Sequence, residues 1–230
     1  MRNIIEKIGK KLKGGDYTLD KRIPISYMSG IAIQRIEMFF RGKLRCFGME
    51  QCGKNLFVGK KVILKCKDKM FIGSGVTIRE NVYMDALSEN GIALGDGCSI
   101  GPGTIIRCSG NYKQLGKGFF MGNNSSLADN CFVGATGGVW IGNDVIGGQN
   151  IRFHSSNHIF SDSVELIRKQ GITSKGIHIG NNCWIGAGVV FCDGVTIGDG
   201  CVVGANAVVT KSFPDNSVIA GVPAKTIAMR

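Results

Sequence analysis

The sequence contains little proline and histidine, with four prolines and three histidines in 230 residues. It has no apolar run near the roughly 20 residues that a transmembrane helix requires, so we expect no membrane-spanning helix. The 35 glycines follow no Gly-X-Y period, which excludes a collagen-like chain. The first residues do not read as a secretory leader, and we expect no signal peptide.

A period of six residues is the strongest pattern in the chain. From Ile179 the sequence reads IGNNCW, IGAGVV, FCDGVT, IGDGCV and VGANAV. The first place is a large apolar residue, and the fourth is always glycine or asparagine. A helix of 3.6 residues per turn cannot use this period, whereas a short strand followed by a bend can. Glycine and asparagine enter the left-handed backbone region at least cost. The sequence therefore predicts an all-β solenoid.

The same period continues toward the N-terminus, faintly at Val58 and Leu64 and clearly from Ile72. Three sixes make one three-sided coil of 18 residues, and interruptions follow at 85–93, 107–120, 134–140 and 154–178. All of these interruptions are expected to leave from the same corner of the coil. Loops on a rigid scaffold often carry function, and 154–178 is the longest of them.

Residues at the fourth place, including the polar ones, are interpreted first as corner residues that are needed for their backbone conformation and not for a chemical role. This interpretation applies to Gly75, Asn81, Gly97, Gly103, Asn124, Asn130, Asp144 and Asn150.

Nine cysteines would indicate disulfides in a short secreted chain. Here four of them share one repeat place, two residues before an apolar inward residue: Cys98, Cys131, Cys183 and Cys201. We predict that these are small buried thiols, which implies a reducing cytoplasm.

The net charge of +11 belongs to the N-terminal part. Residues 1–70 hold 17 Lys and Arg against 6 Asp and Glu, whereas residues 71–230 hold 11 against 11. No nucleic-acid recognition motif accompanies this charge, so no nucleic-acid partner is expected. Two interpretations stay open: a solvated basic face, or contact with an anionic membrane surface or an anionic or lipid-linked substrate.

The repeat also divides the chain. Residues 1–56 lack it and form a basic, partly helical segment, with helices expected at Met1 to Lys13 and at Ile25 to Arg45. Residues 57–230 form the solenoid domain, with 154–178 as a protruding loop. The helical segment is expected to pack on the solenoid, either as a cap on one end or as a face toward a membrane.

Two of the three histidines, His154 and His158, lie at the start of the longest loop. His178 lies between the inward residues Ile177 and Ile179, so it points outward from a strand and is interpreted as a surface residue.

The C-terminal run IGNNCWIGAGVVFCDGVTIGDGCVVGANAVVTKSFPDNSVIAGVPAKTI resembles the hexapeptide-repeat acyltransferase superfamily. Within it, the maltose, galactoside and nodulation-factor acetyltransferases and the polysaccharide O-acetyltransferases are the most similar. The resemblance is dense over 120–230, weaker over 58–119 and absent over 1–57. It implies a left-handed parallel β-helix that assembles as a homotrimer, with acetyl-CoA in the groove between adjacent subunits.

The resemblance also implies roles for individual residues. His158 matches the general base, while His154 falls at a variable position. The backbone N–H of Ala187 matches the donor to the thioester oxyanion, and coenzyme A contacts are implied for Ala187, Ala205, Thr210, Lys211 and Lys225. The nearest matches to acceptor-binding residues are Asp129 and Asn130, although Asn130 is also a corner residue. Ile159 replaces a proline common in the sugar acetyltransferases. The resemblance therefore supports a sugar substrate less strongly than it supports His158 as the base.

The expected function is therefore transfer of acetyl from acetyl-CoA to a sugar hydroxyl, with a surface polysaccharide or its precursor as acceptor. An imidazole that titrates near neutrality is suited to remove the hydroxyl proton, and no covalent nucleophile is required. The alternatives are an amino-sugar N-acetyltransferase, a metal enzyme resembling γ-class carbonic anhydrase with three imidazoles on zinc, and a non-catalytic scaffold. No metal is expected. The expected location is the cytoplasm, with contact at the inner membrane face.

Overall fold

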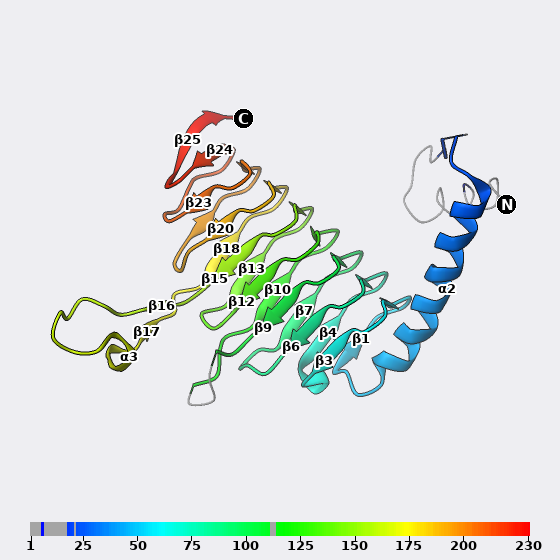
Figure 1. Cartoon of the computed structure of the whole chain (residues 1–230), viewed down its shortest axis with the longest axis horizontal. Coiled ribbons are helices and arrows are strands. Elements are labelled where there is room, and N and C mark those ends of the chain that lie inside the picture. Colours follow the sequence, from blue (N-terminus) through cyan, green and yellow to red (C-terminus); the bar gives the residue numbers. More distant parts are fainter. Residues whose placement is uncertain (1–5, 7–17, 21, 111–113) are drawn as a thin grey trace.

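The computed structural model describes residue 6 and residues 18–20, 22–110 and 114–230 (Figure 1). The helix expected at Met1 to Lys13 lies outside the described residues, apart from Glu6. The chain winds into a column of three-sided coils, with α2 along one side at the N-terminal end and a long hairpin projecting from the other side (Figure 1).

Three sheets form the three faces of the column, and their strands are parallel except for β25, which pairs antiparallel with β24. Sheet A contains β1 (Gln51–Cys52), β4 (Met70–Ile72), β7 (Ile92–Leu94), β10 (Phe119–Met121), β13 (Val139–Ile141), β18 (Ile177–Ile179) and β21 (Thr196–Ile197). Sheet B contains β2 (Phe57–Val58), β5 (Thr77–Ile78), β8 (Ser99–Ile100), β11 (Ser126–Leu127), β14 (Ile146–Gly147), β19 (Trp184–Ile185), β22 (Val202–Val203), β24 (Ser217–Gly221) and β25 (Ala224–Met229). Sheet C contains β3 (Ile63–Lys65), β6 (Tyr83–Asp85), β9 (Ile105–Arg107), β12 (Phe132–Gly134), β15 (Arg152–His154), β20 (Val190–Phe191) and β23 (Val208–Val209).

Each coil passes from sheet A to B to C, so every strand pairs with the equivalent strands of the coils before and after it. The predicted all-β solenoid is confirmed, and the column is a left-handed parallel β-helix. Parallel pairing already begins at β1, inside the N-terminal segment that the sequence assigned to 1–56.

The core is one continuous cluster of inward residues from all three sheets, at the inward places that the sixfold pattern predicted. Phe153 and Phe191 are fully buried and stack on each other with ring centroids 5.1 Å apart. Leu64, in the faint first coil, is only partly buried. Corner residues adopt positive φ as expected, including Asn130 at 57° and Asn150 at 59°. The sixfold pattern therefore predicts both which side chains of a coil are buried and which residues have positive φ.

The three corners are named here by the sheets they join. Residues 148–151 and 186–189, for example, form the BC corner between sheets B and C. All of the long interruptions occur at the CA corner, where the chain leaves sheet C and returns to sheet A, as the sequence predicted. The longest contains β16 (Asn157–His158), α3 (Ile167–Gln170) and β17 (Ile172–Thr173), and a short 3-10 helix, η1 (Lys67–Lys69), occupies this corner in the first coil.

The second predicted helix is present as α2 (Ile25–Cys46). It packs on sheet B through Phe39, whose ring centroid lies 6.0 Å from that of Phe57, while the Arg35 guanidinium lies 3.3 Å from the Phe57 centroid. Cys46 and Cys52 form a disulfide between the end of α2 and the first coil. Among the described residues, no helix is long and apolar enough to cross a bilayer.

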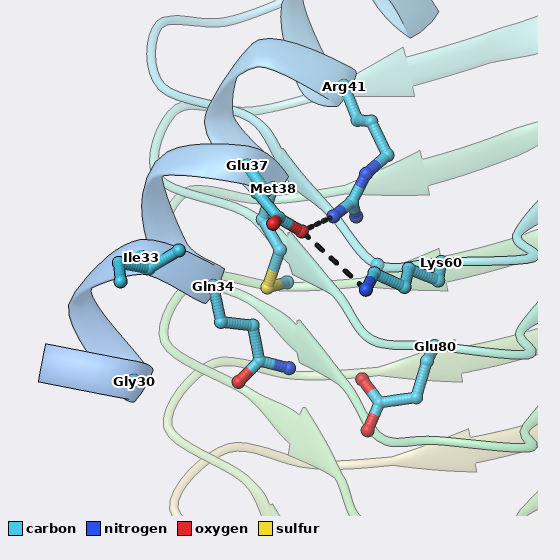
Figure 2. A pocket seen from close by; sticks show the side chains of 9 residues that line it. Gly30, Ile33, Gln34, Glu37, Met38, Arg41, Lys60 and Glu80 are labelled. Atoms are coloured by element: carbon cyan, nitrogen blue, oxygen red, sulfur yellow. Dashed lines mark hydrogen bonds and ion pairs between the residues drawn. The ribbon is translucent and has the colours of Figure 1, made fainter. Parts of the chain in front are cut away.

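A cleft of about 420 Å³ lies between α2 and the first coils. On one side of it, the Glu37 carboxylate pairs with Arg41 at 2.8 Å and with Lys60 at 3.8 Å (Figure 2). Gln34 and Glu80 face the same space from α2 and from a BC corner (Figure 2). Because its charged side chains largely neutralise one another, the cleft mainly joins α2 to the solenoid.

Candidate active site

His158 lies on a two-stranded hairpin that projects from the CA corner (Figure 1). β16 and β17 pair antiparallel, with His158 opposite Ile172 and Asn157 opposite Thr173. The hairpin continues through the hydrogen bond from Ile159 N–H to the Gly171 carbonyl, 3.1 Å long. The His158 side chain is exposed, and within the described part of the chain its imidazole makes no hydrogen bond or ion pair. Its position therefore depends on the backbone of the hairpin.

The outgoing end of the loop is fixed by Ser155, which is fully buried. The Ser155 hydroxyl donates to the Gly134 carbonyl at 2.7 Å and accepts from the Gly137 N–H at 2.9 Å. A buried hydroxyl with both roles satisfied is costly to remove, so this end of the loop has one stable conformation.

The returning end of the loop is fixed by Asp193, from the next coil. Asp193 Oδ1 accepts from the backbone N–H groups of Lys175 and Gly176 at 2.8 and 2.9 Å, and Oδ2 accepts from the Thr173 hydroxyl at 3.1 Å. The Gly176 carbonyl in turn accepts from the Gly194 N–H at 2.8 Å. Asp193 therefore ties the last residues of the loop to the column.

Three aromatic rings stack on the outer face of sheet A beside this end of the loop. Trp140 lies between Phe120, with centroids 5.8 Å apart, and His178, with centroids 4.4 Å apart and planes 3° apart. A Cβ added at Gly176 would lie 2.8 Å from Trp140 Cζ3, so the indole covers Gly176 closely. His178 is exposed, as predicted, but its ring is also part of this stack.

His154 is the second histidine of the loop region. It is the last residue of β15, and its ring centroid lies 5.6 Å from that of Phe132. Burial, followed by the nearby positive charge of Arg152, lowers the pKa of His154. The neutral imidazole is therefore favoured, and the ring lies against the outer face of sheet C rather than on the projecting hairpin.

The residues matched to coenzyme A contacts lie on other parts of the column. Ala187 and Ala205 are equivalent residues of successive BC corners, and their stacking is close: a Cβ on Gly186 would lie 2.6 Å from Ala205 N. Ala187 is partly buried, Ala205 is exposed, and within the described residues neither N–H donates a hydrogen bond. The Ala187 N–H is thus available to an oxyanion.

Thr210 and Lys211 follow β23 at the CA corner of the last complete coil, and both are exposed. Lys225 is an exposed residue of β25, opposite Ala220 in the antiparallel hairpin β24–β25 that ends the column. Asp129 and Asn130 lie at a BC corner nearer the N-terminus, and both are exposed.

The structure does not bring all of these residues together within one chain. His158, Thr210 and Lys211 belong to the CA corner, whereas Ala187 and Ala205 belong to the BC corner. Sheet C separates the two corners. A complete site therefore requires either a second copy of the chain or a ligand that spans sheet C.

The four cysteines at the shared repeat place are buried free thiols, as predicted. Burial raises the pKa of Cys98, Cys131 and Cys183 to about 11. Such thiols are poor nucleophiles at neutral pH. Within the described residues, no group of three His, Cys, Asp or Glu side chains could hold a metal ion.

Residues 176–211 match the family model for the bacterial transferase hexapeptide, six repeats. This part of the chain therefore carries the hexapeptide repeat of the bacterial transferases, and the chain is similar to hexapeptide-repeat acetyltransferases. Two curated members are similar over much of the solenoid. The galactoside O-acetyltransferase of Lactococcus lactis subsp. lactis (strain IL1403) is 33% identical over 141 residues, which is 61% of this chain and 64% of that protein. The galactoside O-acetyltransferase of Escherichia coli (strain K12) is 34% identical over 119 residues, which is 51% of this chain and 54% of that one.

The match thus spans between half and two thirds of these superfamily members. A solved structure, that of AntD, an N-acyltransferase from Bacillus cereus in complex with dTDP and 3-hydroxybutyryl-CoA, has a similar fold. Its TM-score is 0.53 at 18% identity, covering 83% of this chain and 88% of that chain.

Sequence reasoning missed three features of this region: the roles of Ser155 and Asp193 and the aromatic stack on Trp140. The sequence did contain a signal for Asp193, because an acidic residue occupies a corner position where only a change of chain direction is needed. Its partners, however, are 17 to 20 residues earlier and become evident only when the coil register is known.

Proposed function

We propose that this protein is an O-acetyltransferase that moves acetyl from acetyl-CoA to a hydroxyl of a sugar, with His158 as general base. The observation that carries the proposal is the exposed imidazole of His158, which has no partner among the residues that the structure describes and lies on a hairpin whose two ends are fixed to a hexapeptide-repeat column. The similarity to two galactoside O-acetyltransferases supports the choice of a sugar hydroxyl.

In the proposed reaction, His158 takes the proton of the sugar hydroxyl as its oxygen attacks the thioester carbonyl carbon. The Ala187 N–H stabilises the negative charge that develops on the carbonyl oxygen. The carbon–sulfur bond then breaks, the thiolate of coenzyme A leaves and takes up the proton, and the sugar ester is formed. The proposed reaction uses no cysteine, and five of the seven free thiols are buried.

Coenzyme A is proposed to bind along the Ala187 and Ala205 corners, with Lys211 and Lys225 near its phosphates. Small side chains at successive corners leave the strand edges open to an extended pantetheine chain. Both lysines are exposed and can act as point charges for phosphate. Asp129 and Asn130 are proposed, together with His154, to line the acceptor side.

The proposed assembly is a homotrimer in which His158 of one chain faces the Ala187 and Ala205 groove of its neighbour. The separation of the two corners by sheet C supports this arrangement. Co-expression of His158→Ala with Ala205→Trp tests it, because mixed trimers would contain about a quarter of intact sites. Recovery of activity from two inactive variants is expected, and a monomer in solution would refute the arrangement.

The function is tested by following thiol release from acetyl-CoA with a panel of sugars and glycan precursors. A hydroxyl acceptor gives an ester that hydroxylamine cleaves, whereas an amino sugar gives a resistant amide. Cleavable product is expected. Stable product would favour the second candidate, amino-sugar N-acetylation, which the fold similarity to an N-acyltransferase keeps open.

The acceptor is proposed to be a surface polysaccharide or its lipid-linked precursor, reached at an anionic membrane surface. The outward face of α2 supports this, because Ile33, Ile36, Phe40 and Leu44 are 57 to 77% exposed in a strongly basic segment. Sedimentation with phosphatidylglycerol vesicles tests it. Binding should fall in Phe40→Glu but not in Val164→Glu, a control in the distant hairpin that is 93% exposed.

A further inference from the structure

The exposed imidazole of His158 has no side-chain partner within the described residues, so only its backbone determines where it lies. That backbone is one half of a hairpin whose strands have two residues each. A ribbon of this length is marginally stable by itself, so something outside it must hold its geometry.

The outgoing strand β16 leaves the column three residues before His158, at Ser155. The returning strand β17 is directly opposite His158 and ends at Thr173. Thr173 is also the first residue of the returning strand whose side chain is bonded to the column, through the 3.1 Å hydrogen bond to Asp193 Oδ2. The shortest polar connection from the column to the strand facing His158 therefore runs through Asp193.

Asp193 is well placed for this role. It follows β20 in the coil directly after the loop, and its corner is held by the bonds from Cys192 N–H to the Val209 carbonyl and from Gly194 N–H to the Gly176 carbonyl. It is partly buried, and both of its oxygens are used. One carboxylate thus fixes three groups on the returning side of the loop: the hydroxyl at the end of β17 and two backbone N–H groups just after it.

We propose that Asp193 is a positioning residue that sets the register and direction of the β16–β17 hairpin, and through it the location of the His158 imidazole. This inference rests on the proposed role of His158 as general base. Asp193 itself does not touch the reacting groups. Its contribution is geometric, and a displacement of the base by about 1 Å can lower a rate by two orders of magnitude.

The chain contains a matched control for substitution. Asp199 performs the same local task at an AB corner, where its Oδ1 accepts from the Asn181 N–H at 2.6 Å. It lies away from the loop, between sheets A and B. Asp199→Ala therefore removes a similar carboxylate-to-backbone bond from the same kind of scaffold and leaves the hairpin untouched.

The experiment compares Asp193→Ala, Asp193→Asn and Asp199→Ala in the full chain. Steady-state thiol release gives kcat and KM, and hydrogen exchange gives the protection of the Ile159, Lys175 and Gly176 amides. Asp193→Ala should lower kcat about 10- to 100-fold with little change in KM for acetyl-CoA, and should abolish protection of the Lys175 and Gly176 amides. Asp199→Ala should leave kcat and these amides as in the wild type.

Asp193→Asn separates position from charge. The amide oxygen can still accept from the two backbone N–H groups and the NH₂ can donate to Thr173, so most of kcat should return. If Asp193→Asn is as inactive as Asp193→Ala, the carboxylate charge acts directly and the positioning role is wrong. If Asp193→Ala keeps both the protection and the rate, the inference is also wrong.

Hydrogen exchange keeps this test independent of the proposed function. Should the wild type release no thiol from acetyl-CoA, the proposed function fails, while loss of amide protection in Asp193→Ala but not in Asp199→Ala would still establish how the hairpin is held. Normal protection in Asp193→Ala would refute the positioning role even in an active enzyme.

Discussion

Replacing Gly138 with alanine should destabilise the column strongly, because Gly138 lies under the ring of Trp140. Gly138 has φ of 93°, a region that L-residues rarely adopt. A Cβ built there would overlap the indole, and even the most distant of its three nearest ring atoms, Cζ2, is only 2.8 Å away. The indole cannot move easily, since it is stacked between Phe120 and His178.

The magnitude follows from two terms. Placing a side chain at positive φ costs about 1 kcal/mol or more. Overpacking a fixed ring costs about 1–3 kcal/mol. Together they give a loss of about 3 kcal/mol, which in a chain of this size lowers Tm by roughly 6–12 °C.

The assay is thermal and urea unfolding followed by circular dichroism at equal protein concentration. Gly30→Ala is the control, because a Cβ at Gly30 in α2 would have nothing within 4 Å. In a helix interior this change should raise stability by about 0.5–1 kcal/mol. A Gly138→Ala variant that unfolds together with the wild type would refute the packing of Trp140 described above.

Four further predictions concern the core, the thiols and one corner. Phe153→Ala should lower the free energy of unfolding by about 3–5 kcal/mol in urea titrations, since the ring is fully buried and stacked on Phe191. A thiol reagent at neutral pH should label the partly exposed Cys66 and Cys192, whereas the five buried thiols should react only on unfolding. Burial raises the pKa of these thiols in the folded state, so thiolate formation favours the unfolded chain, and stability should fall as pH rises above about 9 in pH-dependent melts. Asn130→Gly should preserve Tm, because glycine also accepts φ of 57°, and should raise KM for the sugar acceptor, because the proposed contact of the Asn130 side chain is lost. An unchanged KM would leave Asn130 with its corner role alone.

The sequence was sufficient to predict the column because one period reports both burial and turning. The inward place predicted Phe153 and Phe191 as core residues, and the fourth place predicted positive φ at residues such as Asn130. It also predicted the outward direction of His178. The places where the period is interrupted predicted that the long loops leave from one corner, and the secondary-structure propensities of the loop residues were not needed.

The rest depends on contacts between coils, which no local pattern encodes. Trp140 and His178 become neighbours only because residues 155–176 lie outside the coil register, between β15 and β18. The disulfide between Cys46 and Cys52 lies where the repeat has barely begun, so the argument for buried thiols did not reach it. The separation of His158 from Ala187 by sheet C could likewise be predicted only after each six-residue unit had been assigned to one face of the column.

The central claim is that a single imidazole on the hairpin removes the acceptor proton. The most direct measurement is kcat for thiol release from acetyl-CoA with a sugar acceptor, in His158→Ala and His154→Ala prepared side by side. Loss of a general base predicts a fall of about 10²- to 10⁴-fold in kcat for His158→Ala, while His154→Ala, on the proposed acceptor side, should change KM for the sugar and leave kcat near that of the wild type. Equal losses in both variants, or full activity in His158→Ala, would contradict the assignment.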